Sequence, residues 1–193
     1  MRYVPAIFLA AALTASCHGQ SPPLAADKAA PGACDARTQK AWPAQKDKGI
    51  GDGVTIEART FGAACAKAVV LLDIRDAAGI PLYTWSARTL DVFGLMDAAD
   101  PPAMKTALAE WIDQGLSAYP DSGQLPDWPE GAATPIAGEF PFYPAEGVDR
   151  EGYLAIRSQG LPMLCFPQGH ESSDCMFMRN GVGESLGLQT FPG

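Results

Sequence analysis

The sequence predicts an α+β protein in which a mostly antiparallel sheet, stapled by disulfides, carries one amphipathic helix packed on a face. Short segments of alternating apolar and polar residues are separated by Gly- and Pro-rich stretches, as is typical of antiparallel strands. Only residues 100–116 show the three-four spacing of an amphipathic helix. The 17 Pro and 20 Gly also favour short elements with many loops over a helical bundle.

The first strand is expected at residues 54–61, where Val54, Ile56 and Ala58 alternate with polar residues. A period of two is typical of a half-buried strand. The preceding stretch, residues 34–42, is expected to form at most a short helical turn. The glycine-rich GIGDG run between the two precedes a strand and opens no helix, so it predicts a turn and not a dinucleotide-binding loop.

Residues 68–87 predict a β-hairpin with its turn at residues 76–79. Gly79 supplies the positive φ that a short turn with a bulge requires. Pro81 lacks an amide hydrogen, so the returning strand is expected to lie at the edge of the sheet, or to begin there.

Residues 100–116 predict the helix. Asp100 suits the N-cap, and the two prolines that follow lie in the first turn, where their missing amide hydrogens cost nothing. An apolar stripe follows the three-four spacing and is expected to pack on the sheet: Met104, Leu108, Trp111, Ile112 and Leu116.

A long irregular connection is expected over residues 118–144. It is rich in proline and carries aromatic rings at Trp128, Phe140, Phe142 and Tyr143. Loops of this length are either functional or poorly ordered, and the rings favour order. We expect them to pack on the core, with a ligand-binding groove as the alternative.

The last fifty residues predict a meander of four antiparallel strands with no intervening helix. Asn180-Gly181 is the clearest turn between them. The expected strands are residues 153–158, 161–167, 174–179 and 186–191.

Residues 183–187, GESLG, match the Gly-x-Ser-x-Gly pattern of a hydrolase nucleophile elbow. That motif requires a buried strand before the serine and an acid and a histidine after it, and neither residue type follows Ser185. We interpret the stretch as a turn before the last strand and predict no catalytic residue. The alternative is a hydrolase in which His170 acts with nearby acids, Glu171 or Asp174.

Five cysteines occur in the chain, and four remain when Cys17 is set aside. In an exported chain an even number predicts disulfides. Cys165 and Cys175 flank a loop between two apolar strands and are expected to pair, which leaves Cys34 with Cys65. A metal site is not predicted, because the chain has no Cys-x-x-Cys motif and a single histidine in the expected domain.

The first residues have the outline of a signal peptide. Arg2 precedes an apolar run of about ten residues, too short to span a bilayer, and small residues lead to Cys17. This stretch resembles a bacterial lipoprotein signal, although the Leu that usually lies three residues before the Cys is one place early, at Leu13. The resemblance implies a lipid on Cys17 and, since His18 replaces the Asp typical of retention in the inner membrane, an outer-membrane location facing the periplasm. The alternative is a soluble periplasmic or secreted protein.

The sequence therefore predicts a signal peptide at residues 1–16, a flexible tether at 17–33 and one domain at 34–193. A net charge of −8 and the absence of a basic run argue against a nucleic-acid partner. We expect a non-enzymatic binding or accessory module that reaches the membrane through its lipid. No cofactor is predicted, and the protein or small-molecule partner is not specified by the sequence.

Overall fold

The computed structural model describes residues 33–137 and 140–191, and the predicted signal peptide and Cys17 lie outside this range. Its strands form two antiparallel sheets. The α+β class is confirmed, with two sheets and two helices where one of each was expected. No helix in the described part of the chain is both long enough and apolar enough to cross a membrane.

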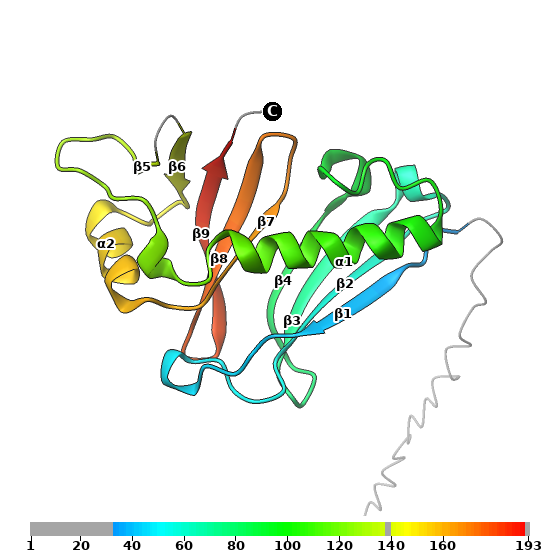
Figure 1. Ribbon diagram of the computed structural model, residues 1–193, viewed down its shortest axis with the longest axis horizontal. Coiled ribbons are helices and arrows are strands. Elements are labelled where there is room, and N and C mark those ends of the chain that lie inside the picture. Colours follow the sequence, from blue (N-terminus) through cyan, green and yellow to red (C-terminus); the bar gives the residue numbers. More distant parts are fainter. Residues whose placement is uncertain (1–32, 138–139, 192–193) are drawn as a thin grey trace, which may run out of the picture.

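The N-terminal sheet is a meander in the order β1-β2-β3-β4 (Figure 1). It contains the predicted strand and hairpin: β2 (Thr55–Phe61), β3 (Val69–Arg75) and β4 (Pro81–Arg88). Gly79 has a φ of 80° in the hairpin turn, and β4 is an edge strand that begins at Pro81, as predicted.

The prediction of a helical turn at residues 34–42 is wrong. Residues Arg37–Ala41 form strand β1, which pairs antiparallel with β2 from Arg37 opposite Arg59 to Ala41 opposite Thr55. The stretch has no apolar period of its own, so its conformation depends on distant partners. The Cys34–Cys65 disulfide and the buried Trp42 hold its two ends against the sheet.

Helix α1 (Pro101–Ala118) begins as predicted, with the Asp100 side chain accepting a hydrogen bond of 2.8 Å from the Ala103 amide. Four residues of the predicted stripe are buried, and Leu116 is partly buried. The helix contacts β1 and β2 of one sheet and β7 of the other, and it crosses both (Figure 1). Trp111 donates its indole hydrogen to the Pro167 carbonyl, 2.7 Å away, which fixes α1 on β7.

The C-terminal sheet has the order β5-β6-β9-β8-β7. Its last three strands correspond to predicted ones, whereas β5 and β6 lie in the segment expected to be irregular. The bounds are β5 (Ile136–Ala137), β6 (Phe140–Pro144), β7 (Met163–Pro167), β8 (Ser172–Arg179) and β9 (Val182–Thr190).

The strand expected at residues 153–158 is wrong, since this stretch lies in helix α2 (Arg150–Gln159). Asp149 caps its first turn by accepting from the Gly152 amide, and Gly160 ends it in the left-handed conformation with a φ of 57°. Tyr153 and Ile156, three residues apart, are buried on one face. These capping signals and this spacing outweigh the apolar alternation that suggested a strand.

The turn expected at residues 183–187 is also wrong. The chain turns at Asn180 and Gly181, both with positive φ, and β9 then runs through the whole GESLG stretch. Close packing explains the glycines: a Cβ on Gly183 would lie 2.6 Å from Tyr83 Cβ, and one on Gly187 would lie 2.2 Å from the Tyr143 carbonyl oxygen.

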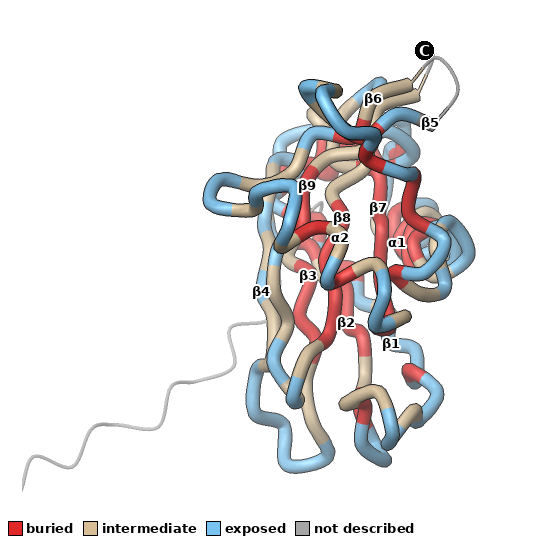
Figure 2. Tube along the Cα trace, turned by 90° about the vertical axis from the view of Figure 1, so that its left-hand side faces the viewer, coloured by how far each residue is buried: buried red, intermediate tan, exposed pale blue. Residues whose placement is uncertain are grey.

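Buried residues concentrate where the two sheets and α1 face one another (Figure 2). Three rings meet there. Trp85 and Trp111 each pack edge-on against Phe166 and lie tilted against each other, with centroid distances of 5.0 to 5.8 Å. A second core lies between the C-terminal sheet and α2. The two sheets share no strand pairing, so side chains alone join β4 to the C-terminal sheet.

Candidate functional site

One face of the N-terminal sheet packs inward and the other remains open. Alternate residues on β2 and β3, such as Ile56, Ala58 and Leu72, are buried in the core. The residues between them therefore point to the opposite face. We call this open surface the arginine face and define it by Arg37, Glu57, Arg59, Phe61, Val69, Asp73, Arg75, Thr84 and Arg88.

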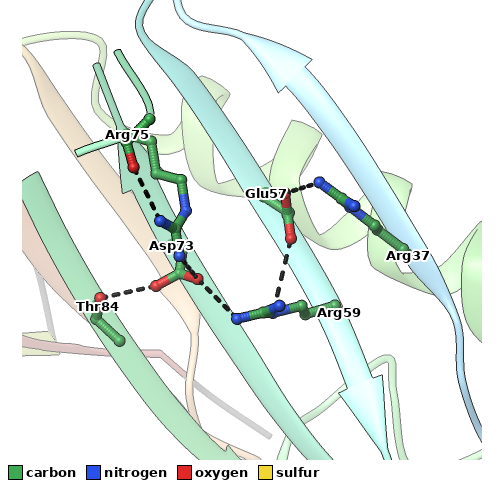
Figure 3. Close-up of polar contacts among 7 residues, drawn as sticks. Arg37, Glu57, Arg59, Asp73, Arg75 and Thr84 are labelled. Atoms are coloured by element: carbon green, nitrogen blue, oxygen red, sulfur yellow. Dashed lines mark hydrogen bonds and ion pairs between the residues drawn. The ribbon is translucent and has the colours of Figure 1, made fainter. Parts of the chain in front are cut away.

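A ladder of charges crosses the arginine face from β1 to β3, and Thr84 of β4 donates a hydrogen bond to its Asp73 (Figure 3). Arg37 pairs with Glu57, and Arg59 lies between the two carboxylates, with Nε 3.6 Å from Glu57 Oε1 and Nη2 3.4 Å from Asp73 Oδ2. Arg75 donates to Asp73 Oδ2 at 2.8 Å. Three guanidinium groups thus surround two carboxylates, which leaves one positive charge in excess.

The two carboxylates are covered by the arginines. Glu57 is 5% exposed and Asp73 is 2% exposed, although both lie on an open sheet face. Burial alone would raise the pKa of Asp73, but hydrogen bonds from Thr84 and Arg75 and the charges of Arg75 and Arg59 outweigh it and hold this pKa below its ordinary value. Asp73 therefore stays ionised, and its charge favours the positions in which Arg59 and Arg75 contact it.

An apolar row borders the ladder. Phe61 and Val69 are cross-strand partners and are 48% and 45% exposed, and Arg88 lies opposite Val69 on β4. The Arg59 guanidinium lies over the Phe61 ring, 5.0 Å from its centroid. The arginine face thus presents guanidinium groups and exposed apolar side chains next to one another.

The two predicted disulfides are present: Cys34–Cys65, with Cα atoms 4.7 Å apart, and Cys165–Cys175, with Cα atoms 4.0 Å apart. The paired cysteines are separated by 31 and 10 positions in the sequence. Such bonds persist in oxidising compartments and indicate that the described part of the chain functions outside the cytoplasm.

The residues of the alternative hydrolase site do not meet. His170 is exposed in the loop between β7 and β8, and within the described residues it makes no hydrogen bond or ion pair. Ser185 lies on β9, five residues from Thr190, which pairs with Ser172 beside that loop. Five strand residues span about 16 Å, too far for a serine–histidine contact.

The aromatic segment packs mainly as predicted. Trp128 and Phe142 are buried, and each ring contacts Tyr153 of α2, with centroids 5.5 and 5.6 Å apart. Tyr143 is 48% exposed. The Trp128 and Phe142 rings therefore form part of the second core.

Two clefts of about 410 and 400 Å³ flank Arg179 at one end of β8. The first also contains Lys46 and Lys48, and the second contains Ser185. Each cation has a carboxylate partner: Lys46 with Asp52, Lys48 with Asp121 and Arg179 with Glu184. The paired charges give neither cleft a preference for anions. In the part of the chain that the structure describes, no group of His, Cys, Asp and Glu side chains is arranged to hold a metal ion.

The arginine face was not predicted from the sequence, although the alternation of residues in β2 and β3 that produces it was present. Once β2 and β3 are paired, residues 57, 59, 73 and 75 fall on one face.

Comparisons of the chain with family models, curated proteins and solved structures find no match.

Proposed function

We propose that the protein is an exported, non-enzymatic binding or accessory module whose partner docks on the arginine face. The observation that carries this proposal is the ladder itself: arginines paired with covered carboxylates, beside exposed Phe61 and Val69. Arginine and aromatic residues dominate the energetics of protein interfaces. Fixing them before binding lowers the entropy lost on association.

The chemistry of the face indicates the kind of partner. The ladder has one positive charge in excess in a chain whose net charge is −8, so the arginine face differs in sign from the chain as a whole. A protein segment with carboxylates beside an apolar side chain matches it.

The size of the face limits the partner. Four strands about 4.8 Å apart, each presenting about seven residues of about 3.3 Å, cover roughly 400 Å². This is about half of what each partner buries in a standard interface of roughly 1,600 Å². The face is therefore suited to a peptide segment or to one part of a larger contact.

The test places a photo-reactive phenylalanine analogue at position 61 in the full chain, expressed in its native envelope. Position 93 is the matched control, because Phe93 is also an exposed phenylalanine, at 53%, and is not on the arginine face. We expect a discrete adduct from position 61 that Arg37→Glu weakens, since Arg37 is largely exposed. Equal adducts from both positions, or no effect of the charge reversal, would contradict the proposal.

We further propose that a lipid on Cys17 anchors the module to a membrane, as its resemblance to a lipoprotein signal implies. The segment between Cys17 and Cys34 is rich in Ala, Pro, Ser and Gly, a composition suited to a flexible tether. Metabolic labelling with palmitate tests the anchor. Wild-type protein is expected to carry label and Cys17→Ser to lose it; equal label and membrane association in both would exclude the anchor.

A further inference from the structure

Asp174 of β8 is partly buried, and it occupies an unusual position. Its neighbours Cys175 and Phe177 point into the core with α2, whereas Met176 and Met178 point into the core between the sheets. Because side chains alternate along a strand, Asp174 faces the core between the sheets with Met176. It is a carboxylate at the seam where β4 of the N-terminal sheet meets β8 and β9.

The groups that face Asp174 give it no cation. Its cross-strand partners are Phe166 on β7 and Leu188 on β9, and β4 contributes Tyr83 and Trp85. Helix α1 contributes Trp111, whose ring packs on Trp85 and Phe166. No ion pair joins Asp174 to a Lys, Arg or His among the described residues, and its Oδ1 atom is buried without a hydrogen-bond partner there.

Among the residues that the structure describes, the other titratable group that faces Asp174 is the Tyr83 hydroxyl. Burial, and next the charge of Asp174, raise the pKa of Tyr83 above its ordinary value, so this group stays neutral in the physiological range. Burial also raises the pKa of Asp174 itself, to about 6, and hydrogen bonding from the Trp85 side chain offsets only part of the rise.

The seam has no strand pairing across it, and it is closely packed at Gly183, which pairs with Met178, four residues along β8 from Asp174. Tyr83 of β4 lies directly on Gly183 of β9, where a Cβ would lie 2.6 Å from both Tyr83 Cβ and the Met176 methyl carbon. The two strands belong to different sheets. The seam therefore depends on side-chain packing, which an ionised and unpaired oxygen opposes.

We propose that Asp174 is a pH-sensitive latch: its protonated carboxyl keeps the seam between β4 and the β8–β9 pair closed, and its ionisation opens the seam to water. Opening relieves the cost of the buried charge, because water then hydrates the carboxylate. The seam is tightest below about pH 4, loosens as the pH rises through about 6 and stays loosened above it.

Strand β4 connects the latch to the arginine face. Tyr83 and Trp85 point into the seam, and Thr84 between them points the other way and donates to Asp73 Oδ1 at 2.7 Å. Movement of β4 at the seam would therefore shift Thr84, which donates to Asp73 of the charge ladder. An effect on partner binding rests on the proposed function, whereas the latch itself does not.

Hydrogen–deuterium exchange of the β4 amides tests the latch on the intact chain without any partner. After correction for the intrinsic pH dependence of exchange, we expect protection of residues 81–88 to fall roughly tenfold to a hundredfold between about pH 4.5 and about pH 8. Asp174→Asn and Asp174→Leu, neither of which ionises, are expected to abolish the fall. Glu171→Gln, at a neighbouring exposed acid, is the matched control and should retain it.

Constant protection in the wild-type chain would overturn the latch, as would a fall of equal size in a folded Asp174 variant. Neither result would bear on the cross-link from position 61. Conversely, loss of that cross-link would leave the exchange profile unchanged.

Discussion

Asp73 and Asp174 lie on opposite sides of β4 and differ in how their carboxylates are withdrawn from water: Asp73 is buried as a whole, whereas Asp174 is partly buried with its Oδ1 atom covered. Asp73 is surrounded by Arg59, Arg75 and Thr84, which hold its pKa below the ordinary value. Asp174 has no cation partner among the described residues, and burial raises its pKa to about 6. The comparison teaches that burial alone does not decide the charge of an acid. Cations and hydrogen-bond donors keep Asp73 ionised, whereas Asp174 lacks a cation among the described residues, so its charge changes with pH.

The largest effect is expected at Arg59, the one side chain that contacts both carboxylates of the ladder. Arg59→Ala removes a shared cation and is expected to lower the free energy of unfolding by about 2–3 kcal/mol, somewhat less than for a fully buried pair because Arg59 is partly exposed. Urea denaturation at neutral pH measures the change. Arg88→Ala is the control: it breaks an exposed pair with Asp91 and should change stability little. If the two variants lower the free energy of unfolding equally, the ladder contributes no more to stability than an exposed ion pair.

Gly183→Ala tests the packing of the seam independently of charge. The added methyl group would overlap Tyr83 and Met176, so we expect a loss of about 1–3 kcal/mol in unfolding free energy. Because the methyl group forces β4 away from β9, Asp174 should become more exposed and its pKa should fall. Gly181→Ala is the control. Its methyl group meets no neighbouring atom, but its φ of 77° strains the backbone, so this variant measures the cost of backbone strain without overlap at the seam. An Asp174 pKa that does not change in Gly183→Ala would contradict the role of seam packing.

Asp174→Asn is expected to stabilise the protein at pH 8 by about 1 kcal/mol, since it removes a buried charge that is only partly hydrated. The sign follows from the raised pKa: ionisation costs stability above about pH 6 and costs nothing below the ordinary value of 3.8. The advantage over wild type should therefore vanish by about pH 4. Thermal unfolding at the two pH values measures it, and a variant that is less stable than wild type at pH 8 would contradict this account.

The smallest effect is expected at Ser185. It is exposed on β9 and makes no contact with His170, so Ser185→Ala should change the free energy of unfolding by less than about 0.5 kcal/mol. Labelling with a serine-reactive fluorophosphonate should be equally absent in both proteins. Specific labelling of Ser185 in the wild type would revive the hydrolase alternative.

Local signals predicted strand β2, the β3–β4 hairpin and α1 because each depends on nearby residues: alternation in the strands, Gly79 in the turn and Asp100 at the helix N-cap. Strand β1 could not be predicted in the same way, since its conformation comes from pairing with β2. Helix α2 carried a readable signal in Asp149 and Gly160, but the apolar alternation of residues 153–158 was given more weight.

The two carboxylate sites differ in how far the sequence could have revealed them. The ladder follows from the pairing of β2 with β3, which places Glu57 opposite Asp73. Both strands were predicted from alternation, although their pairing with each other was not. The Asp174 site depends on how two separate sheets approach each other. No spacing within the sequence encodes that approach, and even Gly183, which makes it possible, was interpreted as a turn residue.

The most direct test of the contrast between paired and unpaired carboxylates is a titration of the side-chain carboxyl carbons by NMR in the wild-type protein. We predict that Asp73 titrates below its ordinary value of 3.8 and that Asp174 titrates near 6. Titration of both groups close to 3.8 would contradict the account, because it would mean that neither the ladder nor the seam controls the charge of the acid that it buries.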